Sequence, residues 1–377
     1  MLACAARVPR VSPLNRGISA RFASTWLLGP ELRSDSGVTY KLDESSVDRH
    51  GTDLPVYESS ADGRQYSVQV IPRKEDFENY LWLQSRVSWS PFVRTATDTI
   101  REHQALVYPG TVPMNLGTKK PRLPFVGKRR VLRGALLGLE HLHARGIVHD
   151  SKLTFHLPIS TAAPPVNLVP QAIVYEETED QKHNGKIMIS LDSIALLPGE
   201  WLTGPGTDFS EPHRSPEAWC AARRNQASDI FSFGTLIIYA MAADTARKLP
   251  FHVDPGRRSS YKSRWRRTMS RQVAMCGGKE SFCGFLEHIG RDSPFRRHLF
   301  PMMNASSAEY SRFPITSGDR LALPPDVADL VAKMTDLDPA RRITAREALN
   351  HKYFMYQAPD SDLSGATTDE TTTLPPE

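Results

Sequence analysis

The spacing of the apolar residues changes along this chain, and that change limits the fold more than any other feature. In the first hundred residues apolar and polar residues alternate in short runs, which is the pattern of half-buried strands. Asp62 and Gly63 separate two such runs and indicate a hairpin turn. We expect a single helix at 75–86 and strands at 36–43, 56–59, 65–71, 92–100 and 103–108.

Beyond about residue 110 the apolar residues recur at helical spacing. A stripe between residues 131 and 142 predicts a helix that Gly146 ends. Residues 228–243 are apolar on nearly all sides and predict a central helix. We expect further elements as two strands at 171–175 and 186–191 and two helices at 324–335 and 344–354. The fold class is therefore α+β, with a small β-rich part at 36–110 and a larger helical part at 111–357.

Composition and charge exclude several classes of protein. A hydrophobic share of 40% and a charged share of 24% are typical of a soluble globular protein. The longest apolar stretch, 230–243, is too short to cross a bilayer, so we expect no transmembrane segment. The four cysteines form no CxxC pair, which suits free thiols in a reducing compartment. Residues 1–30 supply four of the net +5 charges, so we expect no nucleic-acid surface.

Both ends of the chain have unusual compositions. Residues 1–25 are rich in Arg, Ser and Ala and contain no acid, as mitochondrial presequences do. We therefore expect mitochondrial import; the alternatives are a disordered basic arm or a wrongly assigned start, either of which leaves a cytoplasmic protein. Residues 358–377 are acidic and rich in Thr and Pro, and we expect them to be disordered.

Four motifs, in this order, resemble the eukaryotic protein kinase family. They are GLEHLHARGIVHD at 138–150, SPEAW at 215–219, SDIFSFG at 228–234 and DLDPARRITAREALNHKYF at 336–354. These are similar to the family's helix before the catalytic loop, its A-P-E motif, the D-x-W-S-x-G start of its central helix and its closing signature. The resemblance covers about residues 38–357 and is nearest to a group of fungal Ser/Thr kinase-like proteins. It implies a bilobal kinase fold.

The resemblance also assigns structural roles. It pairs Glu217 with Arg342 in a buried ion pair that ties the activation segment to the C-terminal helices. It makes Asp229 the helix-start acid that accepts backbone N–H groups from the catalytic loop. It makes His149 the loop histidine that packs in the core.

The phosphate-binding features of the family are largely missing. Between the first two strands of the family a G-x-G-x-x-G loop covers the phosphates, but the span 43–56 offers only Gly51. Alignment of YSVQVI with the family's strand places Gln69 where the phosphate-binding lysine stands. An amide can donate a hydrogen bond but carries no charge. A helix partner such as Glu78 would then have no lysine to pair with.

The catalytic loop admits two alignments. In the first, Asp150 follows His149 as the catalytic base, and Lys152 lies two residues beyond it. Phe155 then stands at the metal-ligating Asn position. In the second, residues 150–166 are an insertion, and the base, the lysine and the metal ligand become Asn167, Val169 and Ala172. Both alignments lose the metal-ligating Asn, and only the first keeps a base.

The metal-binding D-F-G motif is also open to two alignments. Asp192 keeps the aspartate if Asp-Ser-Ile at 192–194 is the motif. The aspartate is lost if Ser-Leu-Asp at 190–192 matches the D-L-E variant of the fungal group, and both alignments lose the glycine. An active enzyme would use ATP and Mg²⁺, with Asp150 and Lys152 as catalytic residues, Gln69 and Asp192 at the nucleotide, and Asp192 on the metal.

One further segment carries an uneven charge. Residues 247–271 contain nine Lys or Arg residues and a single acid, Asp254, with Tyr261 and Trp265 interleaved. This segment either docks an acidic partner or lipid surface, or is a solvated insertion between helices.

The sequence therefore supports three readings. The first is a catalytically impaired pseudokinase that acts as a binding or scaffold module. The second is an active atypical Ser/Thr protein kinase that transfers the γ-phosphate of ATP to protein hydroxyls, using Asp150 and Asp192. The third takes residues 150–170 as the product of a damaged or wrongly assembled gene.

Overall fold

The computed structural model describes most of the chain outside its two ends. The described ranges are 28–48, 56–110, 114–115, 125–149, 172–175, 187–191, 194–195, 201–202, 213–241, 251, 261–309 and 323–355. Three of the four predicted site residues, Asp150, Lys152 and Asp192, lie outside these ranges, as do the two terminal segments 1–25 and 358–377.

The N-terminal region is an antiparallel sheet with the strand order β1-β2-β3-β4-β6-β5. Asp62 and Gly63 form the two-residue turn between β3 and β4, and both have positive φ, as a tight hairpin turn requires. The predicted strand at 92–100 is wrong for most of its length, because only its last three residues join the sheet. The sheet consists of β1 Glu31–Arg33, β2 Thr39–Asp48, β3 Val56–Ala61, β4 Arg64–Val70, β5 Asp98–Ile100 and β6 Ala105–Pro109.

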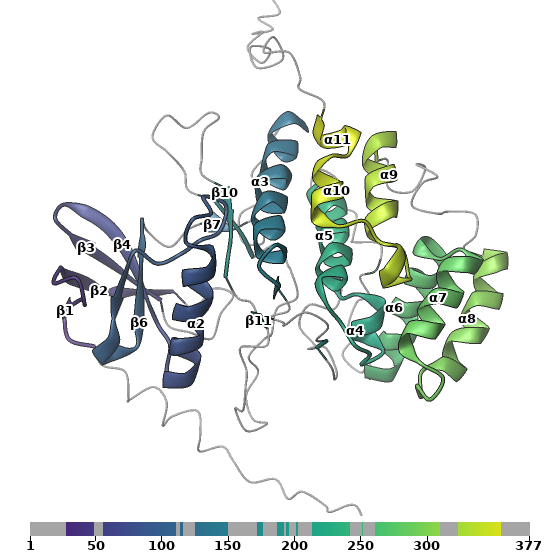
Figure 1. Cartoon of the computed structure of the whole chain (residues 1–377), viewed down its shortest axis with the longest axis horizontal. Helices are drawn as coiled ribbons and strands as arrows, with labels where there is room; N and C mark the ends of the chain where they lie inside the picture. The colour runs from purple at the N-terminus through teal and green to yellow at the C-terminus, as the bar shows by residue number, and fades with distance from the viewer. Residues whose placement is uncertain are drawn as a thin grey trace, which may run out of the picture.

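One helix, α2 Lys74–Val87, covers one face of this sheet (Figure 1). The predicted helix at 75–86 is therefore confirmed. Phe77 and Tyr80 of α2 pack against sheet residues that include Leu106 and Tyr108. Because side chains alternate along β4, its residues 67 and 69 belong to the face under α2, and Val68 and Val70 belong to the opposite apolar cluster.

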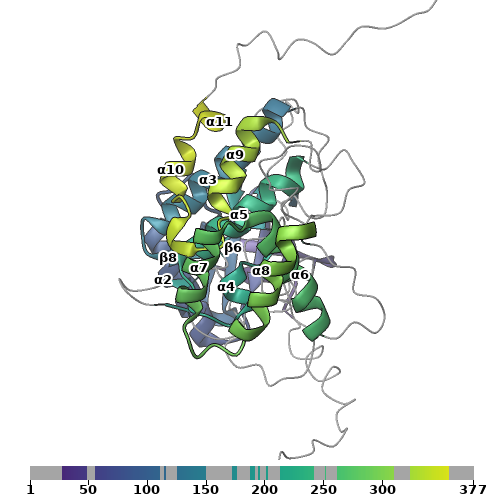
Figure 2. The same cartoon turned by 90° about the vertical axis from the view of Figure 1, so that its right-hand side faces the viewer.

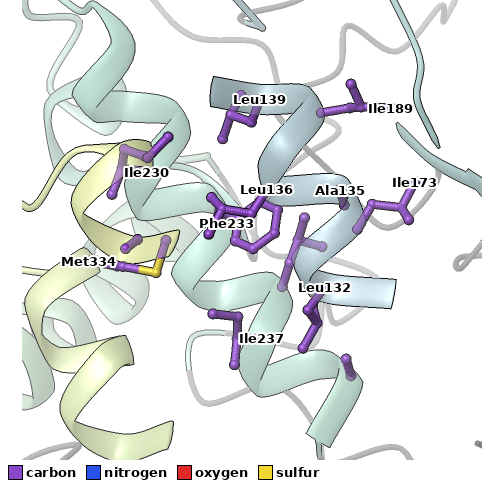
Figure 3. Packing of buried hydrophobic residues seen from close by; sticks show 14 of the residues in the cluster. Leu132, Ala135, Leu136, Leu139, Ile173, Ile189, Ile230, Phe233, Ile237 and Met334 are labelled. Atoms are coloured by element: carbon purple, nitrogen blue, oxygen red, sulfur yellow. The ribbon is translucent and has the colours of Figure 1, made fainter. Parts of the chain in front are cut away.

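The C-terminal region is helical and has its own core. The predicted apolar stripe forms α3 Phe125–His143, and the all-apolar segment forms the central α5 Gln226–Met241. Figure 3 shows Leu132, Leu136 and Leu139 of α3 facing Phe233 and Ile237 of α5, with Met334 on the other side of α5. All of these residues are fully buried, which explains why α5 is apolar nearly all round.

Helix α9 Pro325–Met334 packs closely against α5. Gly234 permits this approach, because a Cβ atom there would lie only 2.6 Å from Cγ2 of Thr335. The predicted helix at 344–354 divides into α10 Ala345–Leu349 and α11 Lys352–Met355, after the predicted capping box of Thr344 and Glu347.

Three further helices and a short one form a second apolar cluster. They are α4 Pro216–Trp219, α6 Tyr261–Cys276, α7 Lys279–Ile289 and α8 Arg296–Glu309. Trp265 of α6 is only 3% exposed, and its indole nitrogen donates to the carbonyl of Trp219 at 3.1 Å. The reading of 247–271 as a solvated insertion is therefore wrong from residue 261 onward, and Trp265 is a core residue rather than part of a docking surface.

Two small sheets lie between the large sheet and the helices (Figure 1). One has the order β10-β9-β7, formed by β7 Met114–Asn115, β9 Ile173–Tyr175 and β10 Ile187–Ile189. The other pairs β8 Ile147–Val148 with β11 Ile194–Ala195. A sheet-rich N-terminal region followed by a helical C-terminal region is consistent with a kinase-like fold. No helix in the described ranges has the length and apolarity needed to cross a bilayer.

Candidate functional site

The loop that follows β8 is held by an acid on the central helix. Asp229 lies in the first turn of α5 and is 2% exposed. Its Oδ2 atom accepts the backbone N–H of His149 at 2.8 Å and lies 2.8 Å from Nε2 of His143. The predicted role of Asp229 as the acceptor of catalytic-loop N–H groups is confirmed for this one group. The position of His149, directly before Asp150, is therefore fixed from inside the core.

His149 in turn fixes the strand end at β10. Its side chain is fully buried, and its Nε2 lies 3.0 Å from the carbonyl oxygen of Ser190. The backbone N–H of Ser190 donates to the carbonyl of Ala172 at 2.8 Å. The structure thus brings together Ala172 and Ser190, the two residues that the second alignment and the D-L-E alignment place at the metal-binding positions.

Gln69 is the one predicted site residue that the structure describes. It lies on β4 between Val56 of β3 and Leu106 of β6, and it is 8% exposed. Glu78, the suggested helix partner, lies on α2 with its side chain half exposed, and its carboxylate is 3.7 Å from Nη1 of Arg101. The position that the alignment assigned to the family's lysine therefore holds a buried neutral amide.

An arginine that sequence reasoning missed lies on the same face of the sheet. Nη2 of Arg94 donates to Oγ of Ser67 at 2.9 Å, and its guanidinium carbon lies 4.1 Å from the centroid of the Tyr108 ring. Ser67 is two residues before Gln69 on β4, so both side chains face the same way. Arg94 is thus a cation on the α2-facing side of the sheet, on the same face as Gln69.

The position of Arg94 follows from an unexpected pairing. Residues 92–94 run beside β10 rather than in the large sheet: Ile189 donates to the carbonyl of Phe92 at 2.8 Å, and Arg94 donates to the carbonyl of Ile189 at 2.9 Å. A cavity of about 230 Å³ lies beside this segment. Among the residues that line it are Trp89, Val93, Arg94, Thr97, Pro109 and Met188. The only sequence signal was an arginine directly after two apolar residues, which is too common to predict a contact.

The predicted buried ion pair is present. Nη1 and Nη2 of Arg342 donate to the two carboxylate oxygens of Glu217 at 2.7 and 2.8 Å, and both side chains are almost fully buried. Arg342 also donates to the carbonyl of Ala227 at 2.9 Å. Burial alone would raise the pKa of Glu217, but the charge and hydrogen bonds of Arg342 outweigh burial and hold that pKa below its usual value.

Comparison with known proteins agrees with this geometry in part. The chain is similar to a protein kinase subunit. It is 24% identical to casein kinase II subunit alpha' of Saccharomyces cerevisiae over 225 residues, which are 58% of this chain and 54% of that protein. The chain thus spans about half the length of this curated relative. No protein-family model matches the chain. The similarity suggests a kinase-like relationship and does not establish activity.

The described residues fit Mg²⁺-ATP poorly. Kinase catalysis needs a lysine on the α/β-phosphates and oxygen ligands for two metal ions. Gln69 supplies no charge to the phosphates, and the side chain of Ala172 has no atom that can ligate a metal. Among the described residues, no three His, Cys, Asp or Glu side chains gather closely enough to hold a metal ion. The described residues of this region hold a loop in place.

Proposed function

We propose that this chain is a bilobal protein-kinase-domain protein of the Ser/Thr type that is catalytically impaired and acts as a binding or scaffold module. The contrast between two sets of residues supports the proposal. The residues that hold the loops, Glu217 with Arg342 and Asp229 with the backbone of His149, keep their contacts. At the position that the alignment assigns to phosphate binding stands Gln69, a buried neutral amide.

The size of the expected loss supports impaired catalysis. Removal of one preorganised electrostatic group typically lowers the rate 10²- to 10³-fold, or by about 3 kcal/mol. In this chain the lysine, the metal-ligating asparagine and the glycine-rich loop are missing together. Such losses are not fully additive within one catalytic unit. The combined deficit still amounts to several orders of magnitude in rate.

One observation favours the second candidate function, an active atypical Ser/Thr kinase. Asp150 directly follows His149, whose backbone N–H is fixed by Asp229, so a base at residue 150 would start from a rigid position. In that reading Asp150 is the base, Lys152 assists it, and Asp192 holds Mg²⁺ beside the nucleotide. The reading still requires a chain that works without a charged residue at position 69.

A thermal-shift titration with Mg²⁺-ATP separates the two functions. For the impaired protein we expect no rise in the unfolding temperature at ATP concentrations up to the millimolar range, because a ligand stabilises a fold only as far as it binds. The matched control is Asp192→Ala. A rise in the unfolding temperature of the unmodified chain that disappears in Asp192→Ala would contradict the proposal and favour the active kinase.

We also propose that residues 1–25 direct mitochondrial import. Their four arginines and their lack of acids support this, because a basic amphipathic segment is drawn inward by the membrane potential. A fusion of residues 1–25 to a fluorescent protein should enter mitochondria in cells, and the same fusion with all four arginines changed to Gln should stay outside. Cytoplasmic fluorescence from the unmodified fusion would refute this part of the proposal.

A further inference from the structure

Helix α6 carries one sign of charge only. Its sixteen residues include Lys262, Arg266 and Arg267, all exposed, together with Arg264 and Arg271, and they include no acid. Lys262 and Arg266 are four residues apart and therefore lie on one side of the helix. Within the basic segment 247–271, this charge lies in the part that the structure describes, 261–271, where Trp265 belongs to the core.

Helix α8 adds cations beside those of α6. The two helices pack together, as Figures 1 and 2 show, with the Trp265 ring 5.3 Å from Phe295 and 6.1 Å from His298. Helix α8 begins with Arg296 and Arg297, and its one acid is its last residue, Glu309. Arg297 is exposed, so both of these neighbouring helices present cations to solvent.

His298 lies between the cations of the two helices: Nε of Arg297 lies 3.3 Å from its Nε2 atom, and its ring is 6.1 Å from that of Trp265, the neighbour of Arg266 on α6. The pKa of His298 is lowered, first by the loss of solvent around the ring and then by the charges of Arg297, Arg266 and Lys262. The groups that act on this ring therefore come from both helices and share one sign. We call Lys262, Arg266 and Arg297 the α6/α8 basic surface.

The chain itself contains an acidic segment of matching charge. Residues 358–377 contain five acids and no base: Asp360, Asp362, Asp369, Glu370 and Glu377. This segment follows α11, which packs on α9 in the same helical region as α6 and α8 (Figure 1). From residue 355 to residue 369 an extended chain reaches up to about 46 Å, whereas the fourteen-residue helix α8 is only about 21 Å long. The extended segment can therefore span more than the length of α8.

We propose that the acidic segment 358–377 binds the α6/α8 basic surface of its own chain. Single exposed ion pairs are weak and are screened by salt. A tether raises the local concentration of the carboxylates into roughly the millimolar range, so several weak pairs suffice for binding. The contact covers the basic surface until salt or an external polyanion displaces the segment.

Zero-length carbodiimide cross-linking of the full chain tests this, because the reagent joins a lysine amine to a carboxylate only when the two are in contact. At low salt we expect Lys262 to be linked to Asp369 or Glu370, as read by mass spectrometry of the digest. In high salt the yield should fall at least threefold. A mixture of isotope-labelled and unlabelled chains should give links within one chain.

Variants at exposed positions test whether the contact between the acidic segment and the basic surface depends on charge. Arg266→Gln with Arg297→Gln should lower the yield of the Lys262 link at least threefold, while the control Arg64→Gln, on the distant β4, should leave it unchanged. Circular dichroism checks that each variant is folded. Three results would overturn the proposal: no link from Lys262 to residues 358–377, links mainly to other acidic segments such as 176–180, or links mainly between labelled and unlabelled chains.

Discussion

The pair of Glu217 and Arg342 is a single contact that joins two distant parts of the helical region. Both side chains are buried and meet through two short hydrogen bonds, 125 residues apart in sequence. Removal of one partner leaves a buried charge with no counter-ion, which is far more costly than the absence of the pair. We expect such a contact to persist whether or not the protein transfers phosphate.

Variants at this pair should differ sharply in stability. Arg342→Met should lower the free energy of unfolding by about 3–5 kcal/mol, because the Glu217 carboxylate remains buried alone. The double variant Glu217→Gln with Arg342→Met should recover much of that loss, since neither charge is left. Urea unfolding followed by circular dichroism measures both. Equal stability of the single and double variants would refute the account.

The same pair predicts a dependence on pH. The folded-state pKa of Glu217 is held below its usual value of 4.5. Its contribution to stability is therefore fully present above pH 4.5 and is lost as the pH falls through the lower folded-state value. Between neutral pH and the acid transition, the unmodified chain should lose more stability than the double variant does. Parallel curves of the free energy of unfolding against pH for the two proteins would contradict the assignment of this loss to Glu217.

At position 69 the structure predicts that a lysine is no longer tolerated. The side chain is buried, and Glu78 is directed toward Arg101 instead. Gln69→Lys should therefore lower the free energy of unfolding by at least about 2 kcal/mol, whereas Gln69→Met, of similar volume, should cost less than about 1.5 kcal/mol. Chemical unfolding compares the two. A neutral or stabilising lysine would mean that a counter-ion is available after all.

At the scale of elements, packing of α5 against α9 depends on one missing side chain. A Cβ at Gly234 would lie 2.6 Å from Cγ2 of Thr335 and 3.1 Å from Cβ of Met334. Gly234→Ala should lower the free energy of unfolding by about 1–3 kcal/mol through overpacking. The control is Gly278→Ala, where the new methyl group meets nothing within 4 Å. Thermal melts of the two variants give the comparison, and equal melting temperatures would refute it.

Helices and turns with a strong local sequence pattern could be predicted from the sequence. Contacts between elements distant in the sequence could not. The helices α3 and α5 and the turn at Asp62 and Gly63 follow from local pattern and turn chemistry. The segment 92–94 was predicted as part of a large-sheet strand because its apolar residues fit one, but tertiary pairing with β10 decided otherwise. Trp265 was read as a surface aromatic because its neighbours are basic, yet one face of α6 is buried.

For the candidate site, the sequence could predict only which residues stand at the positions of the kinase family's site residues. Loss of the charged lysine could be inferred from the alignment at Gln69, and the structure adds that this amide is buried. The contact of His149 with Ser190, and the hydrogen bond from Ser190 to Ala172, needed coordinates, because their partners lie on separate strands. The contact of Arg94 with Ser67 also needed coordinates, because the two residues lie on separate segments of the chain.

At the scale of the whole molecule, the residues that hold a kinase-like fold together differ from those that hold a nucleotide. The N-terminal sheet under α2 and the helical core around α5 are both present. A buried hydrogen bond from the backbone of His149 to Asp229 joins the loop after β8 to that core. Gln69 and Ala172, at the positions that the alignments assign to phosphate and metal, carry no charge. For the proposed scaffold function, surfaces such as the α6/α8 basic surface would serve binding partners.

The central claim is that this chain does not transfer phosphate, and an assay with radioactive ATP tests it most directly. The purified full chain is incubated with Mg²⁺ and γ-labelled ATP, alone and with a generic Ser/Thr peptide substrate, beside the variant Asp150→Asn. The account predicts no incorporation above that of the variant, in the chain or in the peptide. Incorporation that the unmodified chain supports and Asp150→Asn abolishes would contradict it.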